Sequence, residues 1–416
     1  MSNLKSWIRI PENSDFSIHN LPFGIFSTAN KGPRAGVAIG DQILDLSVVA
    51  ASGFWGDLAI DPGVFDRPYL NDFIGLGKAV TNRVRLSLQA SLCDQASPLK
   101  ELAGAFVDQS AATMQLPVQI GDYTDFYSSI EHATNVGKMF RDPENALLPN
   151  WKHIPVGYHG RASSIIPSGV PIRRPMGQVM PNGATQPVFK ASARLDFELE
   201  MAFIIGKESV LGAPIPIEQA EAYIFGMVLF NDWSARDIQK WEYVPLGPFL
   251  GKNFASSMSP WVVTMEALAP FRVEGPVQEP AVLPYLSYQG PKNYDIQLEV
   301  GIIPEEKEET IVSQSNFKYM YWNMAQQLAH HTINGCNVRV GDVMASGTIS
   351  GKEESSYGSM LELAWSGSKP ITLNDGTSRV FINDNDTVVL RGFGHKAGIR
   401  VGFGEVSTKI LPNLKV

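Results

Sequence analysis

The chain has 416 residues, of which 44% are hydrophobic and 18% are charged, and its formal net charge is −8. This is the composition of a globular protein, and the length is large enough to predict two domains. The negative charge argues against nucleic acid or an anionic membrane surface as a partner, although a few arginines in a cleft can still bind an anionic substrate.

Cysteine content and hydropathy both predict a cytoplasmic protein. Cys93 and Cys336 are the only cysteines, which is too few for a disulfide framework and fits a reducing compartment. No segment approaches the ~20 apolar residues that span a bilayer. Residues 1–5 lack the apolar stretch of a signal peptide.

The N-terminal part predicts a small β module with helical additions. Residues 23–27 and 36–39 have strand composition, and residues 42–46 follow a Gly-Asp turn as the second arm of a hairpin. A helix is predicted further on, because four apolar residues recur at every fourth position. These are Val80, Val84, Leu88 and Leu92.

We place the domain boundary after residue 117. Residues 1–117 form a predicted barrel-like N-terminal domain, and residues 118–416 form a predicted C-terminal domain. Residues 114–121 serve as a linker or as the first strand of the C-terminal domain.

Residues 122–150 are rich in polar and aromatic side chains. Ser128 can cap a helix, with Glu131 at the capping-box position. His132 has two interpretations: a hydrogen-bonded structural histidine, or a general base that needs an orienting acid from elsewhere. In the next loop, Tyr158 and Arg161 can bind a carboxylate, or they can be a packed aromatic ring and a surface cation.

Residues 194–206 predict a strand that enters a buried core. Asp196, Glu198 and Glu200 alternate with apolar residues, so a continuous strand would carry all three acids on one face. That face is either solvated or neutralised, and arginine, lysine or a divalent cation would relieve the repulsion.

Another acid, Asp232, follows the next predicted strand. After a short helix at residues 217–223 and a strand at residues 225–230, Asp232 is either a metal ligand or the cap of a helix that begins near residue 234. Arg236, early in this helix, is by itself more typical of a solvated or ion-paired surface residue.

The C-terminal third predicts a helix at residues 319–335 and a strand at residues 387–391. His330 and His331 are adjacent, so they point to different helix faces and make a poor metal pair. Glu362 lies between apolar neighbours, and a histidine would serve as the partner that a buried acid requires.

These residues occur in runs that resemble the fumarylacetoacetase (fumarylacetoacetate hydrolase) family over nearly the whole chain. Leu-Asp-Phe-Glu-Leu-Glu at 195–200 and Asn-Asp-Trp-Ser-Ala-Arg-Asp at 231–237 mark the wider superfamily. The long N-terminal part narrows the resemblance from the wider superfamily to the fumarylacetoacetase family. Further matching runs lie at 14–16, 18–22, 37–47, 122–132, 245–252, 346–351 and 358–363.

The resemblance implies a mainly β fold, with a small SH3-like N-terminal barrel and a large C-terminal β-roll domain, in a homodimer. It also implies a divalent cation, Ca²⁺, bound by Asp125, Glu198, Glu200 and Asp232. A second site of magnesium type (Mg²⁺) would involve Asp232, Lys252 and Ser256. The family has threonine where this chain has Ser256, and serine keeps the hydroxyl.

The implied activity is hydrolysis of the carbon–carbon bond of fumarylacetoacetate to fumarate and acetoacetate, in tyrosine and phenylalanine catabolism. His132 would be the general base, oriented by Glu362. The resemblance assigns Arg236, Gln239 and Lys252 to stabilising negative charge. It assigns substrate binding to Tyr127, Arg141, Tyr158, Gln239, Tyr243 and Thr348.

Elementary chemistry agrees with this assignment. The four acids are hard oxygen donors, which suit calcium or magnesium better than zinc. Cleaving a β-diketone needs an activated water and an enolate leaving group, which a cation with lysine and arginine nearby can stabilise. Two alternatives stay open: a related hydrolase or decarboxylase for acylpyruvates or oxaloacetate, and a non-catalytic calcium-binding protein.

Overall fold

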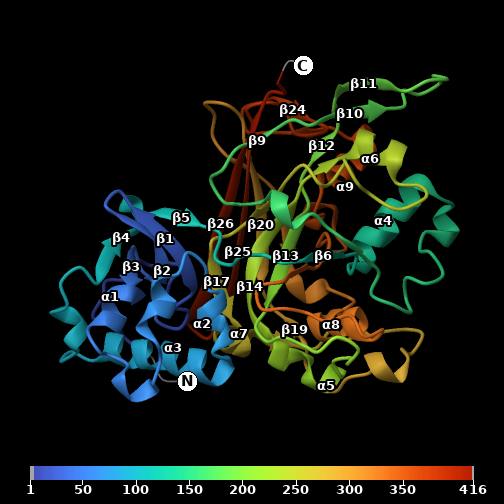
Figure 1. Ribbon diagram of the computed structural model, residues 1–416. Helices are drawn as coiled ribbons and strands as arrows, with labels where there is room; N and C mark the ends of the chain where they lie inside the picture. Colours follow the sequence, from blue (N-terminus) through green and yellow to red (C-terminus); the bar gives the residue numbers. More distant parts are fainter. Residues whose placement is uncertain (1–3, 415–416) are drawn as a thin grey trace.

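The computed structural model describes residues 4–414. Residues 1–3 and 415–416 lie outside the described residues, so the prediction about a signal peptide at residues 1–5 falls partly outside them. The fold mixes α and β and consists mostly of sheet (Figure 1). A sheet of thirteen strands crosses the molecule, and a sheet of five strands packs against it.

The N-terminal part contains the predicted hairpin and helix. In the hairpin, Ile39 pairs with Gln42 across the turn. On the helix, Val84, Leu88 and Leu92 are buried as their spacing predicts. The elements are β1 (Phe23–Thr28), β2 (Lys31–Ile39), β3 (Gln42–Asp45), α1 (Leu46–Ala51), α2 (Asn71–Gly75), α3 (Lys78–Cys93), β4 (Phe106–Asp108) and β5 (Thr113–Gln115).

The N-terminal strands continue into the large sheet, because β1 pairs antiparallel with β17 (Trp261–Thr264) through Phe23 and Val262. The main path runs β4-β3-β2-β1-β17-β14-β13-β22-β6-β7 and is open at both ends. No closed barrel forms among residues 4–414. The description as an SH3-like barrel followed by a β-roll is therefore not confirmed and stays a prediction.

The middle of this sheet carries the acids. β13 is buried at all seven residues, which explains why its sequence after Glu200 is apolar without alternation. The strands on this side are β6 (Tyr123–Phe126), β7 (Gly157–His159), β8 (Ile165–Pro167), β13 (Leu199–Ile205), β14 (Ile224–Asp232), β16 (Ser256–Met258) and β22 (Val343–Ala345).

The second sheet closes the main core. Leu229 of the large sheet belongs to the same buried cluster as Leu298 and Leu390 of the smaller one. The strand at residues 387–391 is confirmed within β25. In order, the sheet contains β21 (Thr310–Asn316), β20 (Gln297–Ile303), β25 (Thr387–Lys396), β26 (Ile399–Leu411) and β9 (Ile172–Arg173).

Short pairs and helices complete the described chain. The two-stranded pairs are β10 (Met176–Val179) with β11 (Val188–Ala191), β12 (Leu195–Asp196) with β15 (Ser234–Ala235), β18 (Arg272–Val273) with β19 (Asn293–Tyr294), and β23 (Ile371–Thr372) with β24 (Ser378–Arg379). The remaining α-helices are α4 (Ile130–Phe140), α5 (Ile217–Ala220), α6 (Arg236–Glu242), α7 (Met265–Leu268), α8 (Met324–Thr332) and α9 (Met360–Leu363), and short 3-10 helices lie between these elements.

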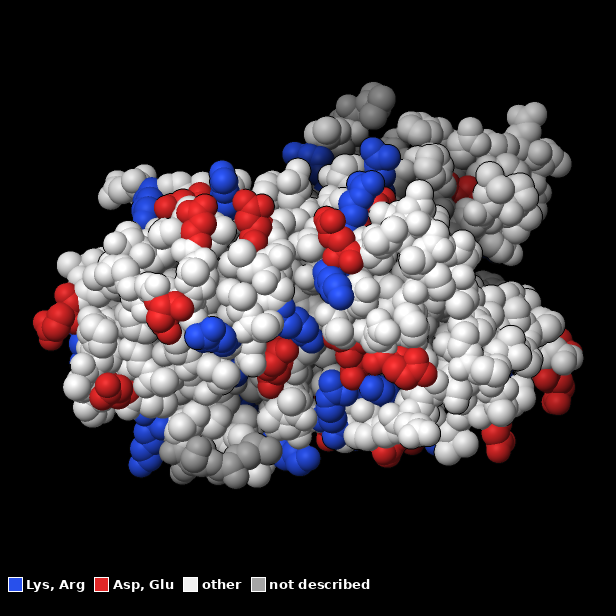
Figure 2. Space-filling view, turned by 60° about the horizontal axis from the view of Figure 1, so that its bottom comes forward, with Lys and Arg blue, Asp and Glu red and all other residues white. Residues whose placement is uncertain are grey.

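The surface and the helix lengths add two observations. Across residues 4–414, none of the helices combines the length and the apolar character that crossing a bilayer requires. On the face shown in Figure 2, acidic and basic side chains are interspersed, so the net negative charge is not gathered there into one patch.

Two local predictions are wrong. The strand expected at residues 194–206 is broken into β12 and β13, so Asp196 does not share a strand face with Glu200. The cap of α4 is Ser129 rather than Ser128, since the Ser129 side chain accepts a hydrogen bond from the His132 backbone N–H. Glu131 therefore does not close a capping box.

The junction between β1 and β17 generates a stability prediction. A Cβ on Gly24 would lie 2.6 Å from the Trp261 ring and 2.9 Å from the Pro260 carbonyl oxygen. We expect Gly24→Ala to lower the unfolding free energy by about 1–3 kcal/mol, because this backbone has no room to move. Gly32→Ala on β2 is the control, since no atom lies within 4 Å of its Cβ position. Equal thermal midpoints for the two variants would contradict the prediction.

Candidate metal centre and active site

Four buried acids lie close together on or beside three strands of the large sheet. Asp125 lies on β6, Glu200 on β13 and Asp232 at the end of β14, and Glu198 immediately precedes β13. The pairing of Leu199 with Asn231 sets Glu198 and Asp232 side by side. Carboxylate oxygens of Asp125, Glu198 and Asp232 lie within 4.8 Å of one another.

Repulsion within this cluster is only partly relieved. One oxygen of Asp125 and both oxygens of Glu200 are buried without a hydrogen-bond partner among residues 4–414. Burial is the main cause that raises the pKa of Asp125, and the negative charge of Asp232 raises it further. Burial likewise raises the pKa of Glu200, and the charge of Asp125 adds to this shift. Unsatisfied buried carboxylate oxygens are hard ligands, so the cluster fits a divalent cation such as calcium or magnesium.

Lys252 supplies one compensating charge. Its Nζ contacts Glu198 and lies 3.0 Å from Asp232. Burial opposes the ionisation of Glu198, but Lys252 and Arg236 outweigh it and lower the pKa of Glu198 to about 2.

Asp232 accepts two further hydrogen bonds. Ser256 faces it in register and donates at 2.8 Å, and the Tyr158 hydroxyl donates at 2.6 Å. These two residues, with Asp232 and Lys252, line a cavity of about 260 Å³. The structure thus brings together the residues expected for the second metal site.

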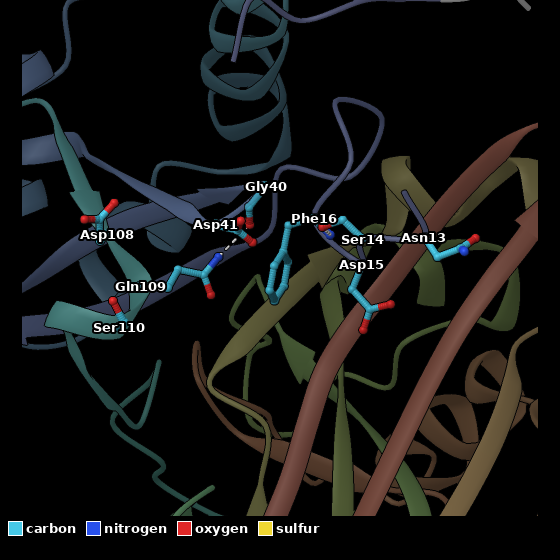
Figure 3. A pocket seen from close by; sticks show the side chains of 9 residues that line it. All are labelled: Asn13, Ser14, Asp15, Phe16, Gly40, Asp41, Asp108, Gln109 and Ser110. Atoms are coloured by element: carbon cyan, nitrogen blue, oxygen red, sulfur yellow. Dashed lines mark hydrogen bonds between the residues drawn. The ribbon is translucent and has the colours of Figure 1, made fainter. Parts of the chain in front are cut away.

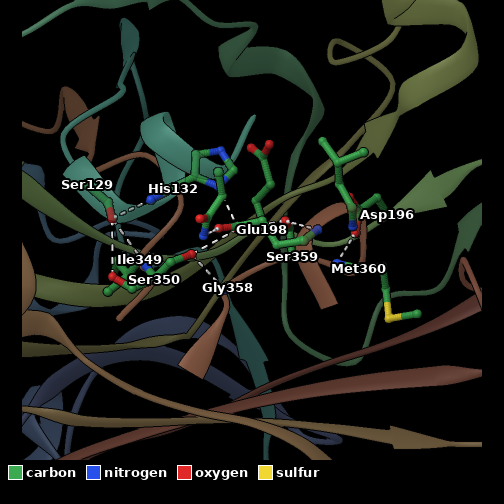
Figure 4. Close-up of polar contacts among 12 residues, drawn as sticks. Ser129, His132, Asp196, Glu198, Ile349, Ser350, Gly358, Ser359 and Met360 are labelled. Carbon is green, nitrogen blue, oxygen red and sulfur yellow. Dashed lines mark hydrogen bonds and ion pairs between the residues drawn. The ribbon is translucent and has the colours of Figure 1, made fainter. Parts of the chain in front are cut away.

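His132 and Glu362 form a buried pair, with Nδ1 of the imidazole 2.6 Å from the carboxylate. Glu362 also accepts hydrogen bonds from Asn135, Ser350 and Ser359, each at 2.9 Å. Figure 4 shows Ser350 and Ser359 beside His132 and Glu198. Burial opposes the ionisation of Glu362, but His132 and these donors lower its pKa below the usual value.

Arg236 joins the carboxylate cluster to α6. Its Nη1 lies 2.8 Å from Glu198 and donates to the Gln239 side chain at 3.3 Å. Its Nε lies 2.8 Å from Asp196. Its Nη2 is buried and has no partner in the described part of the chain, so one donor is available to a ligand.

The other predicted substrate residues are less closely assembled. The Tyr127 ring lies 5.2 Å from the His132 ring. Arg141 ends α4 and donates to the Ala146 carbonyl at 2.8 Å. Thr348 is buried, whereas Tyr243 is 54% exposed at the end of α6. No hydrogen bond in residues 4–414 joins Arg141, Tyr243 or Thr348 to the acids.

Comparison with known proteins assigns the family. The family model of the fumarylacetoacetate (FAA) hydrolase C-terminal domain matches residues 123–410, and that of the fumarylacetoacetase N-terminal domain matches residues 19–117. The chain belongs to the fumarylacetoacetate hydrolase family. It is 56% identical to the fumarylacetoacetases of Homo sapiens and Rattus norvegicus over 98% of its length and 99% of theirs.

A solved structure supports the fold. The fumarylacetoacetate hydrolase from psychrophilic Exiguobacterium antarcticum aligns with a TM-score of 0.54 at 17% identity, covering 94% of this chain and all of that one. At this identity the similarity concerns the fold alone.

The three residues that donate to Glu362 were not singled out from the sequence; they are Asn135, Ser350 and Ser359. Ser359 could have been, because Ser359 and Glu362 have the Ser-x-x-Glu spacing of a capping box. Asn135 lies three residues after His132 on α4, a spacing that puts both side chains on one helix face. Ser350 carries no such signal, because its contact with Glu362 depends on tertiary structure.

A second cavity of about 670 Å³ is lined by residues 13–16, 40–41 and 108–110 (Figure 3). Among its lining residues, Gln109 donates a hydrogen bond to the Gly40 carbonyl at 2.9 Å. None of the residues assigned to the active site of this family member lines it.

The unpaired acids predict a stabilising metal. Calcium or magnesium at 100 times its Kd should add about 2.7 kcal/mol and raise the thermal midpoint by a few degrees relative to chelator. Glu200→Gln should lose most of this response, while its metal-free form unfolds at a higher temperature because one repulsive charge is gone. Glu131→Gln is the control, since Glu131 has an unpaired buried oxygen but lies outside the cluster. A full metal response in Glu200→Gln would contradict the prediction.

Proposed function

We propose that this protein hydrolyses the carbon–carbon bond of fumarylacetoacetate, giving fumarate and acetoacetate in tyrosine and phenylalanine catabolism. The names of relatives that are 56% identical over almost the whole chain support this substrate. The observation that carries the reaction type is the His132–Glu362 pair beside a buried carboxylate cluster.

His132 is proposed as the general base. Its Nδ1 binds Glu362, so Nδ1 carries the proton in the neutral ring and Nε2 is left to accept a proton from water. No hydrogen bond to Nε2 occurs within residues 4–414. Glu362 also stabilises the imidazolium that forms, because its charge is held by three other donors.

The leaving carbanion is stabilised as an enolate. We assign this role to Lys252 and Arg236, which contact Glu198, and to Gln239, which accepts a hydrogen bond from Arg236. They supply positive charge and hydrogen-bond donors. We propose Ca²⁺ bound by Asp125, Glu198, Glu200 and Asp232, where it would supply Lewis-acid polarisation of carbonyl oxygens. The second site, with Asp232, Lys252 and Ser256, is proposed for Mg²⁺.

The substrate is a dianion, which an acidic protein must bind with local donors. We propose that Arg141 and the hydroxyls of Tyr127, Tyr158, Tyr243 and Thr348 bind it, together with Gln239. The unpaired Nη2 of Arg236 adds one more donor at the same site.

We further propose a cytoplasmic homodimer with domains at residues 1–117 and 118–416. An exposed apolar group around the end of α6 supports an interface. Leu246 is 96% exposed, and Trp241 and Phe249 are also exposed. Phe189 lies nearby on β11, because its partner Gln178 accepts a hydrogen bond from Trp241.

The substrate is tested by assaying the purified protein with fumarylacetoacetate and with acylpyruvates, with and without chelator. We expect fumarylacetoacetate to be cleaved with the higher kcat/KM, and cleavage to fall when chelator removes the metal. Preference for acylpyruvates would favour a related hydrolase, and metal binding without any turnover would favour a calcium-binding protein.

The base is tested by substitution. His132→Ala should lower kcat by about 10²- to 10⁴-fold while leaving the circular dichroism spectrum unchanged. Glu362→Gln should also be slow, because the amide cannot balance the imidazolium. His330→Ala is the control, since the His330 side chain hydrogen-bonds to Tyr285 at 3.0 Å and lies outside the pair. Undiminished turnover by His132→Ala would contradict the role of His132 as the base. Undiminished turnover by Glu362→Gln would contradict the role of Glu362 as its orienting acid.

A further inference from the structure

Asp196, which belongs to the acidic run but not to the metal cluster, is fully buried, and both its oxygens accept hydrogen bonds. Its Oδ1 accepts a hydrogen bond from the Met360 backbone N–H at 2.7 Å. Its Oδ2 accepts from the Leu361 N–H at 3.1 Å and from Arg236 Nε at 2.8 Å. Figure 4 shows Asp196 directed at Met360, away from His132.

These contacts join two parts of the site that come from distant segments. Met360 and Leu361 are the first two residues of α9, and Glu362 is the third. The backbone bonds therefore fix the position from which Glu362 reaches His132. Asp196 also orients Arg236, whose Nη1 contacts Glu198. One carboxylate thus sets the spacing between the base and the carboxylate cluster.

The shortness of α9 makes this anchor necessary. The helix has four residues, and so short a helix has no stability of its own in water. Its placement depends on external bonds: the Ser359 cap, the bridge between Glu198 and Ser359, and the two bonds to Asp196. A buried carboxylate bonded to backbone N–H groups and to arginine is the strongest of these.

We propose that Asp196 is a positioning residue that locks the His132–Glu362 pair in register with Arg236 and the carboxylate cluster. Asp196 itself does not touch the reacting atoms. The inference rests on the roles proposed above for His132, Glu362 and Arg236. Loss of its charge would let α9 and Arg236 shift, and a misplacement of about 1 Å can cost about 100-fold in rate.

The chain offers a closely matched control. Asp45 is also buried, bonds to the Nε of Arg34, and accepts from the Ser47 and Val48 backbone N–H groups at the start of α1. It has the same chemistry at a helix start in the N-terminal part, where no site residue lies. Asp196→Asn and Asp45→Asn therefore remove equivalent charges.

We expect both variants to unfold at lower temperature, but only Asp196→Asn to lose turnover. Its kcat for fumarylacetoacetate should fall by about 100-fold, with KM changed by less than about threefold. Asp45→Asn should keep the wild-type kcat. A kcat for Asp196→Asn within twofold of wild type, or an equal loss in both variants, would overturn the proposal.

A second measurement does not need turnover. In protein labelled with ¹⁵N-histidine, the short bond from His132 Nδ1 to Glu362 should give a downfield imidazole proton signal, assigned by its loss in His132→Ala. Asp196→Asn should shift or lose this signal and Asp45→Asn should retain it. An unchanged signal in Asp196→Asn would overturn the proposal even if the wild-type protein proved inactive toward fumarylacetoacetate, which would itself refute only the proposed substrate.

If Asp196→Asn does not fold, Asp196→Glu takes its place. It keeps the charge beside Arg236 but moves the carboxylate by one methylene, so the contacts to Met360 and Leu361 cannot all be kept. We expect a reduced kcat and a displaced imidazole signal in a folded protein. Wild-type values for both would overturn the proposal.

Discussion

Buried negative charge is the constraint on which this structure depends. Oxygens of Asp125, Glu198 and Asp232 lie within 4.8 Å of one another, and Glu200 adds a fourth carboxylate beside them. Lys252 and Arg236 are the cations that contact this cluster among residues 4–414. Arg236 is in addition shared with Asp196. The excess of charge is costly in a low-dielectric interior. The cluster is therefore tolerable only where the surrounding sheet over-determines its geometry and a ligand can complete the balance.

The sheet meets this demand by register. Four strands from three separate parts of the chain lie in the order β14-β13-β22-β6, and their pairing fixes the position of each acid. Backbone hydrogen bonds, rather than the acids themselves, hold the carboxylates together. β13 and β14 are buried along their whole length. The burial of their apolar side chains offsets the repulsion between the acids near their ends.

The strands, the hairpin and α3 could be predicted because local periodicity determines them. Asp196 could not be placed this way, since the alternation argument assumes a continuous strand. The strand breaks because Glu198 bonds through its backbone to the Asn231 side chain and bridges to Ser359. Likewise, His132 and Glu362 lie 230 residues apart. Residue types alone left the role of His132 open, and the pairing was expected only from the family resemblance.

The acidic run at 196–200 therefore contains two kinds of carboxylate with opposite requirements. Asp196 accepts N–H donors on both oxygens and is paired with Arg236, so it is neutralised without a cation and acts as a fixed anchor. Glu200 has no donor among the described residues, so it is useful only when a cation is present. The short break between β12 and β13 carries the chain from one environment to the other. Asp196 therefore holds the start of α9 through contacts that need no cation, whereas Glu198 links the cluster to Ser359 at the cap of the same helix.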